Sequence, residues 1–236
     1  MTEAGWLNEY FHAQSMLCGL RESTNVARTK VGRRKLRLFA CGCCAMFWKH
    51  LHSPRLRKAV EVAERFAEGL ATKDELEAAA ADAHEFIGCE EPYGQEQTAV
   101  WMAQSTTMAQ PFAAAFNITA RPVPAPGWGS DVRDRDAVIR DDQKCEAMTR
   151  ELLRDIFGNP FRPSTPLPRA ILAWNGGTVR RLAETIYEER AFDRLPILAD
   201  ALLDAGCDNE ELIAHCRSAG PHVRGCWAVD LILGKS

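Results

Sequence analysis

Apolar side chains recur at intervals of three and four residues along most of this 236-residue chain, and this spacing is the feature that most constrains its fold. After Ser53-Pro54, a pair typical of a helix start, the apolar positions are Ala59, Ala63, Phe66 and Leu70. No stretch alternates apolar and polar residues over the length of a strand. The pattern therefore predicts an all-α protein, built as a compact multi-helix array or bundle.

Residues 36–51 are predicted to form the central helix of this array. They carry an apolar stripe and further apolar side chains on the other faces, which is typical of a helix buried on all sides. Two capping boxes predict helix starts elsewhere, at Thr72 with Glu75 and at Asp208 with Glu211.

Residues 119–131 contain three prolines and two glycines, the composition of a linker or loop. This stretch predicts an N-terminal helical part over residues 1–118 and a C-terminal helical part over residues 132–236. The two parts can also belong to a single domain, because the chain is short enough for one core.

Nine cysteines are present, an odd number, and the first residues lack the charged and apolar regions of a secretory signal. We therefore expect reduced thiols in a cytoplasmic protein, most of them acting as small buried hydrophobic side chains. No apolar stretch approaches the ~20 residues that span a bilayer, so no membrane association is expected.

Basic residues are concentrated near the N-terminus. Residues 21–58 hold eleven Lys/Arg and one acid, a net charge of +10, whereas the rest of the chain holds 18 bases and 31 acids, or −13. Internal pairing of the two regions is the favoured interpretation, and contact with a nucleic acid is the alternative. The residues that would contact phosphate lie in the segment 28–37 and are Arg28, Lys30, Arg33, Arg34, Lys35 and Arg37.

The C-terminal region holds the residues whose side chains are best suited to catalysis or metal binding. If one helix runs from about residue 222 to 233, its same face carries His222, Cys226 and Asp230, which are spaced four residues apart. One hypothesis makes Cys226 a nucleophile, His222 its base and Asp230 the orienting acid. A second places a structural zinc ion on Cys207, Cys216, His222 and Cys226, with His215 nearby. The third interpretation is purely structural, with Cys226 in the core.

Cys41 and Cys44 have the CxxC spacing of half a zinc site, and Cys43 lies between them. Candidate partners are His50, His52, His84, Cys89 and Cys207. The motif lies inside an apolar helical pattern, however, and not in the polar turn of a zinc knuckle. Three core cysteines are therefore the favoured interpretation.

Three motifs carry a resemblance to a known group of proteins. They are RKLRLFACGCC at residues 34–44, IFGNPFRP at residues 156–163 and HVRGCWAVDL at residues 222–231. With them the chain resembles, over nearly its whole length, an uncharacterised bacterial protein family that is heavily duplicated in some genomes. The resemblance supplies no catalytic residue and no known function that could be carried over to this chain.

No phosphate-binding loop, dinucleotide fingerprint, nucleophile elbow or HExxH motif is present in the sequence. The leading hypothesis is thus a non-catalytic helical module that binds another protein. The alternatives are a small zinc-binding protein that uses C-terminal Cys and His ligands, and a nucleic-acid-binding protein.

Overall fold

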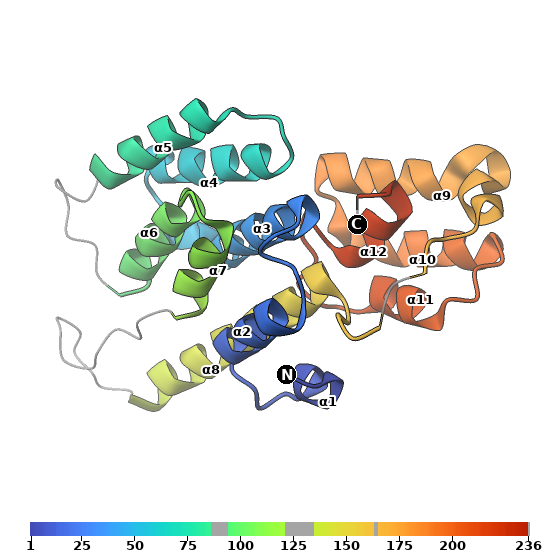
Figure 1. Cartoon of the computed structure of the whole chain (residues 1–236), viewed down its shortest axis with the longest axis horizontal. Helices are drawn as coiled ribbons and strands as arrows, with labels where there is room; N and C mark the ends of the chain where they lie inside the picture. Colours follow the sequence, from blue (N-terminus) through green and yellow to red (C-terminus); the bar gives the residue numbers. More distant parts are fainter. Residues whose placement is uncertain (86–93, 121–134, 163–164, 236) are drawn as a thin grey trace. The chain divides into compact units, whose positions relative to one another are not determined.

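The computed structural model describes residues 1–85, 94–120, 135–162 and 165–235. These residues form twelve α-helices and no β-strand, which confirms the predicted all-α array (Figure 1). The chain divides into two compact units, Met1–Arg150 and Glu151–Ser236, called here the N-terminal and C-terminal units. No helix of the described residues is both long and apolar enough to cross a bilayer.

The boundary between the units differs from the predicted linker. It falls inside helix α8 (Arg135–Phe157), whereas most of the segment 119–131 lies outside the described residues. Part of α8 belongs to the N-terminal unit, where Glu146 accepts a hydrogen bond from the backbone N–H of Ala13 at 2.5 Å. A proline- and glycine-rich composition predicts a loop, but it does not predict which of two hydrophobic cores the following helix packs into.

The N-terminal unit is built around α3 (Lys30–Met46), which packs against three later helices. The others are α1 (Glu3–Leu7), α2 (Ala13–Ser23), α4 (Pro54–Ala67), α5 (Lys73–Glu85), α6 (Gly94–Thr106) and α7 (Pro111–Thr119), with a 3-10 turn at Trp48–His50. The side chains of α3 are buried from Leu36 to Cys44, which confirms a central buried helix. Its bounds are earlier than predicted, because the chain tightens into the 3-10 turn after Phe47.

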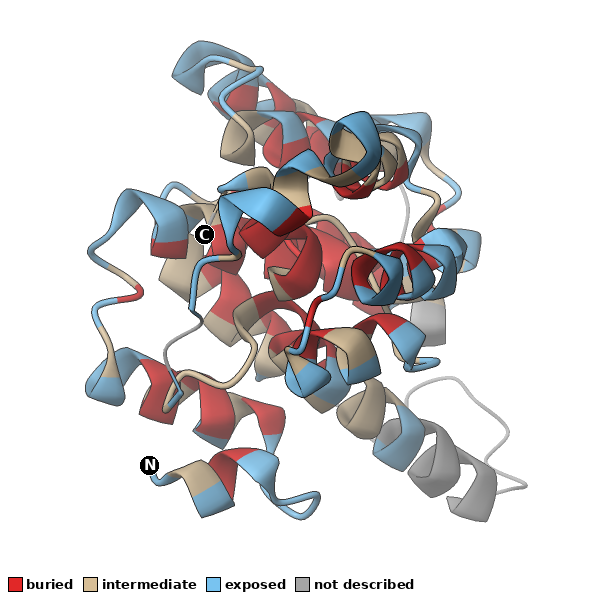
Figure 2. Ribbon diagram, turned by 90° about the vertical axis from the view of Figure 1, so that its right-hand side faces the viewer, coloured by how far each residue is buried: buried red, intermediate tan, exposed pale blue. Residues whose placement is uncertain are grey.

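The C-terminal unit contains the end of α8 and four further helices: α9 (Arg169–Glu189), α10 (Leu195–Asp204), α11 (Glu210–Arg217) and α12 (Trp227–Leu233). Helix α9 is interrupted by non-helical backbone from Trp174 to Gly177, and a 3-10 turn (Phe192–Arg194) precedes α10. Buried residues from α9 to α12 form one hydrophobic core. Figure 2 shows that most helices of the two units have buried residues on one side and exposed residues on the other.

The two predicted capping boxes have different outcomes. At α5, the N–H of Thr72 donates to Glu75 Oε2 at 2.6 Å and the N–H of Glu75 donates to Thr72 Oγ1 at 3.2 Å, which confirms the first. The second is wrong by one residue: Asn209 caps α11 and accepts from the N–H of Leu212. Both Asp and Asn suit the position, so the sequence alone did not separate these neighbours.

Arg37 is a buried cation in the middle of α3, with only 1% of its surface exposed. Its guanidinium donates to the backbone carbonyls of Thr106 and Met108 at 2.6 and 2.9 Å, and to that of Ala109 at 3.4 Å. The first of these carbonyls belongs to the last residue of α6 and the other two follow it; a helix end leaves acceptors without intrahelical donors. The guanidinium also lies 5.2 Å from the centre of the Phe66 ring. Arg37 therefore ties α3 to the end of α6.

Replacement of Arg37 by Met is expected to lower the free energy of unfolding by about 3 kcal/mol, because buried carbonyls lose a charged donor. Urea denaturation followed by circular dichroism measures the change. The matched control is Arg33→Met, on an exposed position of the same helix, where a change within about 0.5 kcal/mol is expected. Equal effects of the two substitutions would contradict this role for Arg37.

Candidate metal centre

Four side chains with metal-ligating atoms converge in the C-terminal unit: Asp155, His215, His222 and Cys226. One ligand atom from each lies within 4.8 Å of the other three. They come from distant parts of the sequence, since Asp155 lies near the end of α8, His215 lies on α11 and the other two precede α12. Among the residues that the structure describes, this is the one such group that could hold a metal ion.

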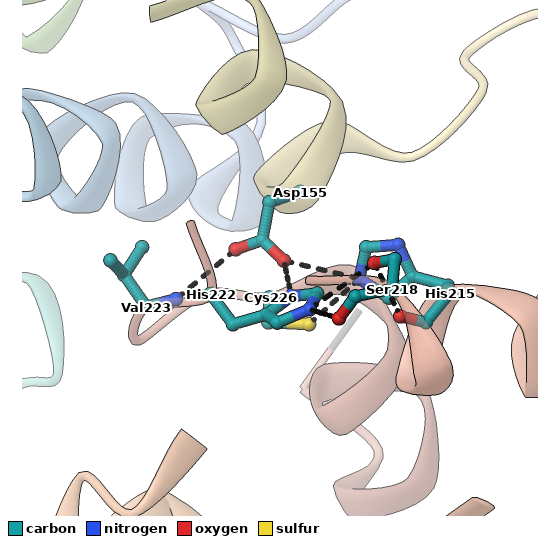
Figure 3. Close-up of polar contacts among 6 residues, drawn as sticks. All are labelled: Asp155, His215, Ser218, His222, Val223 and Cys226. Carbon is teal, nitrogen blue, oxygen red and sulfur yellow. Dashed lines mark hydrogen bonds and ion pairs between the residues drawn. The ribbon is translucent and has the colours of Figure 1, made fainter. Parts of the chain in front are cut away.

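Asp155 lies at the centre of the group. Its Oδ1 is 2.7 Å from His222 Nδ1 and 3.1 Å from His215 Nε2. Its other oxygen, Oδ2, accepts a hydrogen bond from the backbone N–H of Val223 at 3.2 Å. Figure 3 shows the carboxylate pointing from α8 toward the two imidazoles and the thiol. One carboxylate oxygen is therefore held by the backbone, and the other faces the group.

The two imidazoles present different nitrogens to the group. His215 Nε2 lies 3.1 Å from Asp155 Oδ1 and 3.2 Å from Cys226 Sγ. His222 faces the group with Nδ1, because its Nε2 is 3.1 Å from the carbonyl oxygen of Ser218. A ring N–H that donates to a backbone carbonyl fixes the tautomer and leaves the other nitrogen free to bind a metal. The rings themselves are edge to face, 4.9 Å between centres.

All four side chains are shielded from water. The exposed fraction is 3% for Asp155, 7% for His222 and 16% for His215, and Cys226 is fully buried. The indole of Trp227 covers His215, with 5.0 Å between ring centres. A buried carboxylate needs compensating charge or hydrogen bonds, so the two histidines are the partners that allow Asp155 to stay ionised.

Without a metal, the charges in the group shift its pKa values in different directions. Burial opposes ionisation of Asp155, but the hydrogen bonds and positive charges of His215 and His222 outweigh it and lower its pKa. Burial likewise opposes protonation of His222, but Asp155 outweighs it and raises the pKa of the imidazole. Burial, and then the charge of Asp155, raise the pKa of Cys226 well above its ordinary value. The metal-free thiol is thus protonated at neutral pH.

The turn before α12 brings Cys226 to the group. Helix α12 begins at Trp227, and Cys226 is its N-cap. The preceding residue, Gly225, has a φ of 92°, a left-handed conformation that side chains other than glycine's rarely adopt. This turn allows Cys226 and His222, four residues apart, to face the same carboxylate.

The structure corrects the predicted catalytic set. Because α12 starts only at Trp227, His222 lies before the helix, and the helical stripe through His222, Cys226 and Asp230 does not form. Asp230 is buried on α12 outside the group, and Asp155 occupies the place predicted for it. A thiol–imidazole–carboxylate triad uses both nitrogens of one ring, whereas His215 contacts both partners through Nε2. The geometry therefore does not favour a nucleophilic Cys226.

Of the four predicted zinc ligands, two belong to the group and two do not. His222 and Cys226 belong to the group, but Cys207 and Cys216 are buried in the hydrophobic core among apolar side chains. Burial, then the charge of Asp155 and the neighbouring Cys207, raise the pKa of Cys216 to about 12. The other two members of the group are Asp155 and His215. Asp155 is 60 residues from His215 in the sequence, so no local spacing links them, although Asp155 immediately precedes the IFGNPFRP motif.

The cysteines of α3 are core residues, as the favoured interpretation held. Cys41, Cys43 and Cys44 are buried and unoxidised, and they belong to no metal-ligating group of the described residues. Cys89, one of their candidate partners, lies outside the described residues.

Half of the predicted phosphate-binding residues are turned into the N-terminal unit. Lys35 is buried, as is Arg37, and Arg34 pairs with Glu68 at 2.9 Å. Arg34 thus pairs with an acid outside the basic region, as internal pairing predicts, whereas Arg37 bonds backbone carbonyls and not an acid. The internal pairing of the two regions as a whole stays a prediction. Arg28, Lys30 and Arg33 are exposed.

The stability of the metal-free protein is expected to peak in mildly acid solution. Asp155 has a lowered pKa, so its contribution is complete above the ordinary carboxyl value of 3.8 and is lost as the pH falls through the folded-state pKa. His222 has a raised pKa, so its contribution is complete below 6.5 and is lost as the pH rises through the folded-state pKa. Thermal unfolding at a series of pH values, with a chelator present, measures this profile.

Asp155→Asn is the variant that tests this profile. It removes the titrating carboxylate itself and the negative charge that raises the pKa of His222. It should flatten the pH dependence, whereas Asp200→Asn, in an exposed ion pair with Arg217, should leave it unchanged. If the profile of Asp155→Asn superimposes on that of the wild type, the buried pair does not control stability.

Gly225→Ala is expected to destabilise the C-terminal unit by about 1–2 kcal/mol, because the new side chain opposes the left-handed backbone. Gly220→Ala is the control in the same segment. A Cβ there would make ordinary contacts, at 3.7 Å with Ser218 Oγ and 3.9 Å with His222 Cε1. Thermal unfolding compares the two, and an equal loss in both would show that the turn at Gly225 has no special role.

Comparisons with protein-family models, with curated proteins and with solved structures gave no match.

Proposed function

We propose that the chain is a non-catalytic helical module whose C-terminal unit binds one structural zinc ion through Asp155, His215, His222 and Cys226. The observation that carries this proposal is the convergence of four atoms of the types that zinc prefers, on side chains at most 16% exposed: one sulfur, two imidazole nitrogens and one carboxylate oxygen. A tetrahedral zinc site places such atoms roughly 3.3–3.8 Å apart. Three of the pairs lie at 2.7, 3.1 and 3.2 Å, and all of them lie within 4.8 Å, so shifts on the order of 1 Å accommodate the ion.

The charges of the group support a divalent ion. One carboxylate and one thiolate carry two negative charges, which a zinc ion neutralises while both imidazoles stay neutral. Zinc also reverses the effect of burial on Cys226, because a coordinated thiol loses its proton. The same ligands suit magnesium or calcium poorly, since those ions prefer oxygen atoms throughout.

The ligand count supports a structural role. Catalytic zinc sites leave one position for water or substrate, whereas structural sites use four protein ligands. Here four protein atoms are available and all four side chains are shielded from water. The groups that orient the ligands are also protein atoms, namely the carbonyl of Ser218 and the N–H of Val223.

The interaction role predicted from the sequence stays a prediction. A surface that favours it is the start of the N-terminal unit, where Leu7, Tyr10 and Phe11 are 53%, 92% and 41% exposed. A nucleic-acid role has less support, because three of its six predicted contact residues are engaged within the unit.

Purified protein is expected to contain about one zinc ion per chain, measured by elemental analysis after gel filtration. Cobalt substitution should give the strong visible bands of a tetrahedral ion and a thiolate charge-transfer band. Loss of an outer hydrogen-bond partner commonly costs 10–100-fold in affinity, so Asp155→Asn, His215→Gln and Cys226→Ala should each cost about 100-fold or more.

Cys216→Ala is the matched control for these variants, because Cys216 is a buried cysteine of the same unit outside the group. It should keep stoichiometric zinc. Substoichiometric zinc in the wild type after growth with added zinc, together with no cobalt spectrum, would refute the proposal.

A further inference from the structure

We propose that zinc locks the segment 218–226 onto the C-terminal unit, so that zinc supply controls whether this segment and the cap that it places on α9 are formed. This inference rests on the proposed zinc site. It concerns regulation, since it states which part of the fold responds when the ion binds or leaves.

The segment 218–226 joins α11 to α12 and supplies two of the four proposed ligands, His222 and Cys226. Its own backbone bonds are short-range, from the N–H of His222 to Gly220 and from the N–H of Cys226 to Val223, each at 3.0 Å. A longer-range hydrogen bond runs from the backbone N–H of Val223 to the side-chain oxygen Asp155 Oδ2. The group of four side chains is therefore a main attachment of this segment to α8 and α11.

Arg224 carries the effect of the group to another helix. It lies two residues from each of the ligands His222 and Cys226, so they determine where its backbone sits. Its Nε and Nη2 donate to the carbonyls of Tyr187 and Glu188, each at 3.3 Å, and its guanidinium lies 5.3 Å from the centre of the Tyr187 ring. These carbonyls belong to the last turn of α9, where a cation is favourable. Arg224 therefore caps α9 from within the segment.

Removal of zinc should open this segment without unfolding the unit. Helix α12 and the rest of the core are held by apolar contacts among α9, α10, α11 and α12, which do not involve the ion. The segment has few such contacts, because its residues other than His222, Gly225 and Cys226 are exposed or partly exposed. Parts of a fold with little buried apolar surface open at the lowest free energy.

Hydrogen–deuterium exchange with mass spectrometry on the full chain tests the lock. Without zinc, amides of residues 218–226 and of the end of α9 should exchange about tenfold faster or more, because the ion stabilises only the closed form. Amides of α10 should exchange at the same rate in both states. In Cys226→Ala, the segment should exchange quickly whether or not zinc is added.

Arg224→Gln distinguishes loss of the cap on α9 from loss of zinc binding. Arg224 is not one of the proposed ligands, so this variant should keep stoichiometric zinc and the tetrahedral cobalt spectrum. The end of α9 should nevertheless exchange faster even with zinc bound. A wild type that binds zinc but shows unchanged exchange in residues 218–226 would overturn the lock and leave the zinc site standing. A wild type that binds no zinc would remove both.

Discussion

The buried carboxylate of Asp155 is the constraint on which the arrangement of the C-terminal unit depends. With 3% of its surface exposed, it has lost nearly all its hydration, and an ion in that position must be compensated by nearby groups. The compensation comes from His215, His222 and the N–H of Val223. These partners belong to α11 and to the connection before α12, so satisfying one charge brings together three segments of the chain.

Protons and a zinc ion can each balance this group. With protons, an ionised Asp155 faces a protonated His222, and Cys226 stays a neutral thiol, as the pKa directions indicate. With zinc, the ion balances a carboxylate and a thiolate, and both imidazoles are neutral. Both arrangements use the same four side chains. The helical core of the unit is therefore expected to persist in either state, and only the segment 218–226 is expected to open when the proposed zinc ion leaves.

Local features of the fold could be predicted from the sequence, and long-range ones could not. The reciprocal bonds of Thr72 and Glu75, and the burial of α3, follow from residues within one or a few turns of each other. Half of the candidate site was also visible, since His222 and Cys226 stand four residues apart. Asp155 could not be linked to His222 and Cys226 from the sequence, because its contact with them depends on how the end of α8 packs against α11. The predicted stripe through Asp230 failed for a local reason, the left-handed turn at Gly225 that delays the start of α12.

Arg37 in the N-terminal unit shows why the group around Asp155 points to a ligand. Both residues are buried charges on helices. Arg37 is compensated by backbone carbonyls, which bind no metal in this arrangement and stay in place because α6 ends there. Asp155 is compensated by two imidazoles beside a thiol, although backbone donors or an arginine would have served the carboxylate equally well. A purely structural ion pair gives no reason for a second imidazole at the same oxygen or for a thiol beside that imidazole, whereas the proposed tetrahedral zinc site gives each of the four groups a role.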